Sequence, residues 1–107
     1  MFRILNQKIA TFKNILSTIK TGQSYLVDVR TTQEYNNGHI PNAIHLPIQK
    51  IEEMPQLLQK YKDKPLVFYC KAGIRSKRAT DIANHLNLKS SNYKGSWDEY
   101  HNFINNK

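Results

Sequence analysis

The fold of this 107-residue chain is decided by one stretch, Leu66-Val67-Phe68-Tyr69-Cys70-Lys71-Ala72-Gly73-Ile74-Arg75-Ser76. It opens with a short apolar run typical of a buried strand and then reaches the only cysteine of the chain. Four residues separate Cys70 from Arg75, and Ser76 is a favoured residue type at a helix N-cap. We therefore expect a buried strand, a tight loop holding Cys70 and a helix capped by Ser76. The apolar residues that follow have the spacing of one helix face, at Ala79, Ile82, Ala83 and Leu86.

The loop surrounds Cys70 with groups that favour a negative charge. The first N–H groups of a helix lack partners within the helix and carry partial positive charge. Gly73 allows successive N–H groups to turn toward one anion, and Lys71 and Arg75 add two full positive charges. Such surroundings lower the pKa of a thiol, so the sequence predicts a nucleophilic Cys70. The alternative is a structural buried cysteine, and the polar residues after Cys70 argue against it.

The rest of the chain alternates between short apolar runs and amphipathic segments. We expect strands near Ile9 and at residues 25–29, 42–46, 66–69 and 91–93. Pairs with capping-box spacing, Thr31 with Glu34 and Ser96 with Glu99, predict two helix starts. The expected helices run from a Thr11 cap to Thr21-Gly22, from Thr31 to Gly38, up to about Met54, from Pro55 to about Lys60, from Ser76 to an Asn87 C-cap, and from about Trp97 to near the chain end.

This alternation predicts an α/β fold with three layers, in which helices cover both faces of a central, mostly parallel five-stranded sheet. The length fits a single domain over residues 1–107. Ligands of such sheets bind outside the carboxyl ends of the strands, and Cys70 directly follows a strand. Fold and chemistry therefore indicate the same edge of the sheet.

Composition excludes several classes of protein. The net charge is +8, but the lysines are scattered and no run of five basic residues occurs, so we expect no nucleic-acid partner. No apolar run approaches a membrane span, and residues 1–5 are too short for the apolar core of a signal peptide. A single cysteine rules out an internal disulfide. We therefore expect a cytoplasmic protein.

Three further polar residues invite a catalytic interpretation. Asp28 stands at the end of an apolar run, where a carboxylate needs a partner, and we expect backbone N–H groups or Arg30 to provide it. Asp28 and Arg30 then support the site without taking part in the reaction. His39 and His45 are expected to be structural, since neither has the spacing of a metal ligand and a thiolate needs no general base.

The loop Cys70-Lys71-Ala72-Gly73-Ile74-Arg75-Ser76 resembles the active-site loop of rhodanese-like sulfurtransferases. Other segments resemble the same family in the expected order, and together they extend from about Ile9 to Ile104. They are Asp28-Val29-Arg30, Glu34-Tyr35, Gly38-His39-Ile40-Pro41-Asn42-Ala43, Leu46-Pro47, the segment before Lys64-Pro65, Lys94-Gly95 and Trp97.

The resemblance implies that Cys70 attacks an anionic sulfur donor, such as thiosulfate, and carries the sulfur as a persulfide. A thiol, cyanide or a protein then accepts the sulfur, and the resemblance implies no metal and no organic cofactor. The side chains of Lys71 and Arg75 would bind the donor anion, and the backbone N–H groups of the loop would hold the terminal sulfur. The implied substrate-binding residues are Lys71, Ala72, Gly73, Ile74, Arg75 and Ser76.

Two alternatives remain open. A sulfur relay or regulatory binding module would not use thiosulfate efficiently, and Glu34 stands where some two-domain members place a cation, which disfavours thiosulfate. A cysteine phosphatase or arsenate reductase is the other alternative. Phosphatase loops of this kind have five residues between cysteine and arginine, whereas this chain has four, a spacing that suits one sulfur atom better than a tetrahedral oxyanion.

Overall fold

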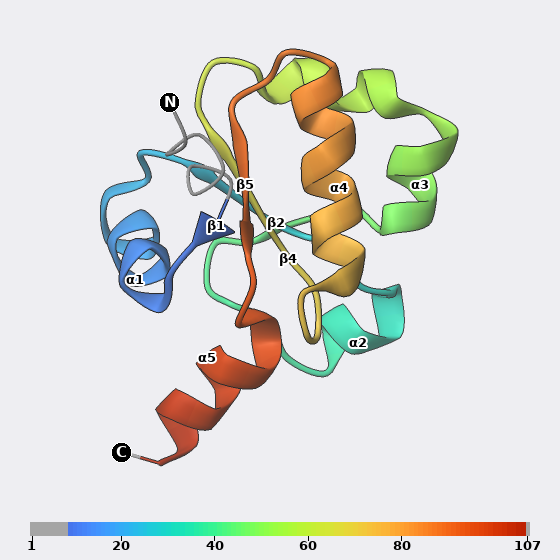
Figure 1. Ribbon diagram of the computed structural model, residues 1–107. Helices are drawn as coiled ribbons and strands as arrows, with labels where there is room; N and C mark the ends of the chain where they lie inside the picture. Colours follow the sequence, from blue (N-terminus) through green and yellow to red (C-terminus); the bar gives the residue numbers. More distant parts are fainter. Residues whose placement is uncertain (1–8, 107) are drawn as a thin grey trace.

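Five short strands form the centre of the protein (Figure 1). The structure, a computed structural model, describes residues 9–106, and the signal-peptide expectation for residues 1–5 lies outside them. The strand order is β1-β5-β4-β2-β3, and each pair of neighbouring strands in this sheet is parallel. The predicted parallel sheet is therefore confirmed. The strands are β1 (Ile9–Ala10), β2 (Tyr25–Asp28), β3 (Ile44–His45), β4 (Leu66–Tyr69) and β5 (Ser90–Tyr93).

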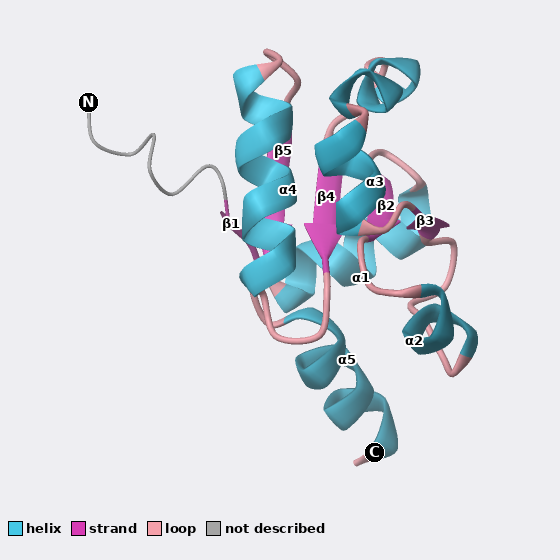
Figure 2. Cartoon of the chain, turned by 90° about the vertical axis from the view of Figure 1, so that its right-hand side faces the viewer, coloured by secondary structure: helices cyan, strands magenta, loops and turns pink. Residues whose placement is uncertain are grey.

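Helices cover both faces of this sheet, which confirms the predicted three layers (Figure 2). The 3₁₀ helix η2 packs with α3 and α4 on one face, while α1 and α5 pack on the other. The short helix α2 lies near the loop that follows β4 (Figure 1). Their bounds are α1 (Phe12–Thr21), α2 (Thr32–Asn36), α3 (Ile48–Glu53), η2 (Pro55–Tyr61), α4 (Ile74–His85) and α5 (Ser96–Asn105). None of these helices has the length and apolar character needed to cross a membrane.

Side chains along β4 alternate between the two faces of the sheet, as the period of a strand requires. Phe68 and Cys70 belong to the cluster under α4, whereas Val67 and Tyr69 belong to the cluster under α1 and α5. Every residue of β4 is buried, because this strand lies between β5 and β2. The alternation therefore directs the thiol of Cys70 toward the start of α4.

Helix boundaries confirm part of the capping pattern. Thr11 caps α1 with its side chain, and Gly22 ends that helix in the left-handed conformation. Thr31 and Glu34 form the predicted capping box at the start of α2. Asn87 is left-handed, but the C-cap of α4 is Leu86, one residue before the predicted C-cap.

Two predicted N-caps are wrong. Helix α4 begins at Ile74 after a left-handed Gly73, so Ser76 lies inside the first turn and its hydroxyl contacts Cys70 instead of capping. Helix α5 begins at Ser96 itself, so that serine does not form a capping box with Glu99. In both cases the serine hydroxyl lies close to the Cys70 sulfur, and the spacing of residues along the chain does not predict this contact.

The core beneath α4 offers a test of the fold. Leu58 of η2 is fully buried in this cluster, whereas Leu16 on α1 is 42% exposed. Replacing Leu58 by Ala should lower the free energy of unfolding by about 2–5 kcal/mol, because the lost side chain leaves a cavity. Leu16→Ala is the matched control, with an expected change of about 0.5 kcal/mol or less. Urea unfolding measures both, and equal losses would contradict the described packing.

Candidate active site

Cys70 lies directly after β4, at the carboxyl edge of the sheet. Its thiol accepts hydrogen bonds from two backbone N–H groups, that of Gly73 at 3.1 Å and that of Ser76 at 3.4 Å. The Ser76 hydroxyl lies 3.3 Å from the same sulfur. The residue is only 1% exposed. The sulfur is therefore buried, but it is ringed by donors rather than by aliphatic atoms alone.

Two opposing effects set the acidity of this thiol. Burial is the largest single contribution, and it favours the neutral thiol. Hydrogen bonds from the Ser76 hydroxyl and from the N–H groups of Ser76 and Gly73, with a smaller contribution from the N–H group of Ala72, stabilise the thiolate and together outweigh burial. The pKa of Cys70 therefore lies below its ordinary value, as the sequence predicts. These donors are uncharged, so the lowered pKa does not depend mainly on Lys71 and Arg75.

Gly73 gives the loop its shape. Its φ of +98° lies in the region that favours glycine, and a Cβ atom there would come within 2.7 Å of the carbonyl oxygen of Lys94. The side-chain amide of Asn92, on β5, donates to the Gly73 carbonyl over 3.2 Å. The end of β5 thus braces the residue whose N–H group points at the sulfur.

The start of α5 holds the backbone of Cys70 and Lys71. The N–H group of Cys70 donates to the Ser96 hydroxyl over 3.1 Å. The Cys70 carbonyl accepts from the N–H group of Trp97 at 2.9 Å, and the Lys71 carbonyl accepts from that of Asp98 at 3.1 Å. N–H groups in the first turn of a helix lack partners within the helix, so these contacts satisfy both elements at once.

The two cations predicted to bind a donor anion both lie against carboxylates. Arg75 makes a two-pronged ion pair with Glu34, with N–O distances of 2.8 and 3.1 Å. The hydrogen bond from Arg75, aided by the Thr31 cap and opposed by burial, lowers the pKa of Glu34 to about 2. Lys71 pairs with Asp98 at 3.0 Å in a more exposed position. The charge of each cation is thus largely balanced.

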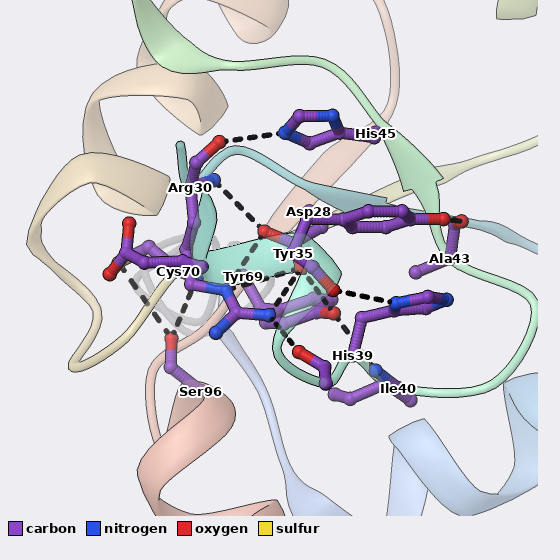
Figure 3. A network of polar contacts seen from close by, with 12 residues as sticks. Asp28, Arg30, Tyr35, His39, Ile40, Ala43, His45, Tyr69, Cys70 and Ser96 are labelled. Atoms are coloured by element: carbon purple, nitrogen blue, oxygen red, sulfur yellow. Dashed lines mark hydrogen bonds and ion pairs between the residues drawn. The ribbon is translucent and has the colours of Figure 1, made fainter. Parts of the chain in front are cut away.

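A buried polar network supports the edge of the sheet beside the loop (Figure 3). Asp28 accepts from the backbone N–H group of Arg30 at 2.9 Å and from its guanidinium at 2.8 Å, which confirms the predicted partners. The Tyr69 hydroxyl donates to Asp28 at 2.7 Å and accepts from the N–H group of Ile40. The guanidinium also stacks 4.9 Å from the ring of Trp97. Asp28 and Arg30 therefore link β2 and β4 to α5, and neither contacts the sulfur in the described hydrogen bonds.

His39 and His45, the two histidines considered above, lie beside this network in a stack with Tyr35 (Figure 3). The ring of Tyr35 is stacked between His39, at 3.7 Å, and His45, at 4.5 Å. Each imidazole also contacts a backbone carbonyl, that of Tyr35 for His39 and that of Arg30 for His45. Between residues 9 and 106, no group of three or more potential ligands could hold a metal ion.

Of the predicted site residues, Gly73 and Ser76 contact the Cys70 sulfur, Gly73 through its N–H group and Ser76 through its N–H group and hydroxyl. Ala72 contributes through its N–H group to the lowered pKa of Cys70. Ile74 begins α4 and is 82% exposed. Sequence reasoning did not find the site contacts of Asn92 and Ser96. A polar residue in a buried strand was the available signal for Asn92, and Ser96 resembled an ordinary helix cap.

Comparisons with known proteins find similar sequences. The family model described as "Rhodanese-like domain" matches residues 10–103. A mouse protein named "Thiosulfate sulfurtransferase/rhodanese-like domain-containing protein 3" is 35% identical over 87% of this chain and 68% of its own length. Human "Thiosulfate:glutathione sulfurtransferase" is 31% identical over 78% of this chain and 84% of its own.

A solved structure has a similar fold. A human single-domain sulfurtransferase is 27% identical, with a TM-score of 0.76, over 89% of this chain and 96% of that one. A relative from Schizosaccharomyces pombe, 34% identical over 97% of this chain and 84% of its own length, carries a name that places it in mitochondria. The relatives therefore include a protein of another compartment than the one expected from this sequence.

The contact between Ser76 and the sulfur generates a measurable expectation. Ser76→Ala removes a donor that stabilises the thiolate, so the pKa of Cys70 should rise and alkylation by iodoacetamide near pH 6 should slow about three- to tenfold. Ser90→Ala is the matched control, because the Ser90 hydroxyl bonds to Thr80 and Asn84 instead. Identical pH profiles for the two variants would remove Ser76 from the sulfur site.

Proposed function

The chain belongs to the rhodanese-like domain family, and on that premise we propose that it is a sulfurtransferase that carries the transferred sulfur as a persulfide on Cys70. The observation that supports this most strongly is the set of donors around Cys70, two N–H groups and a hydroxyl within 3.4 Å of its sulfur. Such donors stabilise a thiolate before the reaction and a persulfide anion after it.

The first step is a displacement at sulfur. The Cys70 thiolate attacks the outer sulfur of the donor, a new S–S bond forms, and the old bond breaks with its electron pair on the leaving group. Thiosulfate then releases sulfite, whereas an organic persulfide releases a thiolate. Because Cys70 is 1% exposed, the geometry favours donors that present one slim terminal sulfur.

The second step passes the sulfur to another molecule. A thiol, cyanide or a protein nucleophile attacks the terminal sulfur, and the Cys70 thiolate leaves. The chain contains no second cysteine, so it holds no thiol that could resolve the persulfide internally. The acceptor is therefore another molecule. We also propose that the reaction takes place in the cytoplasm.

The charge balance around the loop favours an organic persulfide donor over thiosulfate. Sulfite leaves with two negative charges next to the reacting sulfur, whereas a thiolate leaves with one. Glu34 balances Arg75, and Asp98 balances Lys71. The side chains thus offer little net positive charge to a departing dianion.

Loss of the thiol tests the proposed carrier. Cys70→Ser should abolish sulfur transfer, because a serine hydroxyl neither ionises near neutral pH nor forms a stable persulfide. After incubation with polysulfide, mass spectrometry of the parent protein should show a gain of about 32 mass units that cyanide or a reductant reverses. The variant should show no gain while its circular dichroism spectrum stays unchanged. Retained turnover in Cys70→Ser would exclude this route. Hydrolysis of an aryl phosphate by the parent protein, without sulfur transfer, would favour the phosphatase alternative.

The role of Glu34 in donor choice is tested by removing only its charge. Glutamine also serves at the third position of a capping box, so Glu34→Gln keeps the start of α2 and frees Arg75. We expect kcat/KM for thiosulfate to rise about three- to tenfold, with a smaller change for glutathione persulfide. Asp98→Asn is the matched control, since it frees Lys71 in a more exposed pair and should change the ratio less. An equal effect of Glu34→Gln on both donors would contradict the proposed selectivity.

A further inference from the structure

Ser96 occupies a backbone conformation that its residue type disfavours. Its φ is +55°, in the left-handed region, and it lies at the first position of α5. A side chain in that region costs free energy that glycine would avoid, and such residues persist where the surrounding structure holds them. Ser96 is fully buried, so its hydroxyl must also find partners within the protein. The conformation therefore calls for an explanation in what the hydroxyl contacts.

The hydroxyl connects the nucleophile to the end of β5. It accepts a hydrogen bond from the N–H group of Cys70 at 3.1 Å and donates to the carbonyl of Tyr93 at 2.9 Å. The oxygen also lies 3.9 Å from the Cys70 sulfur. Figure 3 shows Ser96 reaching Cys70 from the start of α5, at the margin of the polar network.

The next residues of α5 continue this contact. The N–H group of Trp97 binds the carbonyl of Cys70, so both backbone polar groups of the cysteine are held by consecutive residues of α5. The left-handed turn at Ser96 is what brings the hydroxyl and the N–H group of Trp97 to the same peptide segment. An alanine at this position would leave the buried N–H group of Cys70 without that acceptor, and such loss is costly.

We propose that Ser96 is a positioning residue whose hydroxyl fixes the Cys70 peptide, so that the sulfur stays within reach of its donors at Gly73 and Ser76. The proposal rests on Cys70 being the nucleophile. Ser96 acts through the backbone of Cys70, and that contact offsets the free-energy cost of its left-handed conformation. Without the hydroxyl, the sulfur shifts relative to the loop and the thiolate loses part of its hydrogen bonding.

Two substitutions separate strain from positioning. Ser96→Gly relieves the left-handed backbone but removes the hydroxyl, whereas Ser96→Ala removes the hydroxyl and keeps the strain. Asn87→Gly is the matched control, because Asn87 is also left-handed, with a φ of +65°, and follows the far end of α4. All three variants are compared with the parent by thermal unfolding and by the pH profile of Cys70 alkylation with iodoacetamide.

The expected outcome is a loss of reactivity in both Ser96 variants, with a smaller loss of stability in Ser96→Gly than in Ser96→Ala, because only glycine relieves the left-handed backbone. Both Ser96 variants should be alkylated about three- to tenfold more slowly near pH 6, and their profiles should shift to higher pH. Ser96→Gly should unfold at a temperature no lower than that of Ser96→Ala, and Asn87→Gly should keep the parent profile. A parental profile in Ser96→Gly would overturn the proposal, as would an equal shift in Asn87→Gly.

The alkylation readout is independent of sulfur transfer. If the Ser96 variants shift the profile while the parent protein forms no persulfide, positioning stands and the proposed function fails. If the parent forms a persulfide and the Ser96 variants keep its profile and rate, the proposed function stands and positioning fails. The two conclusions are therefore tested separately.

Discussion

The site depends on one requirement, that a sulfur atom buried at the end of a central strand must have hydrogen-bond donors. Cys70 finds them because Gly73 reverses the chain and α4 begins at once, so the N–H groups of Gly73 and Ser76 converge on the thiol. The backbone of the same cysteine is satisfied by α5. The two helices lie on opposite faces of the sheet, so the layered fold and the acidity of the thiol have a common origin.

Charge plays a different part from the one that composition indicates. The chain carries a net charge of +8, and two of its cations flank the sulfur in sequence. In space Arg75 and Lys71 are each paired with a carboxylate, so neutral donors dominate the immediate surroundings of the thiol. A site built on backbone donors stabilises one compact anion well and depends less on ionic strength than a cluster of exposed cations.

Much of the architecture follows from local patterns, because periodicity and turn residues act over short distances. The five strands, the parallel sheet, the caps at Thr11 and Thr31 and the partners of Asp28 were predicted from such patterns. The resemblance places Ser76 in the site, but the contacts of the Ser76 and Ser96 hydroxyls with Cys70 are not predicted, since both serines have the spacing of an N-cap. Whether a serine caps a helix or contacts a distant sulfur is decided by tertiary packing, as the pairings of Arg75 and Asn92 also are.

The alternation along β4 links the quality of the fold to its chemistry. Tyr69 faces α1 and α5, where it anchors the buried carboxylate, and Cys70 faces α4. A slip of one residue in strand pairing would exchange these faces and place the phenol and the thiol in each other's surroundings. A mispaired molecule would lose the contact of Tyr69 with Asp28 and the donors of the Cys70 sulfur together. The fraction of reactive thiol therefore also measures the fraction of correctly folded chains.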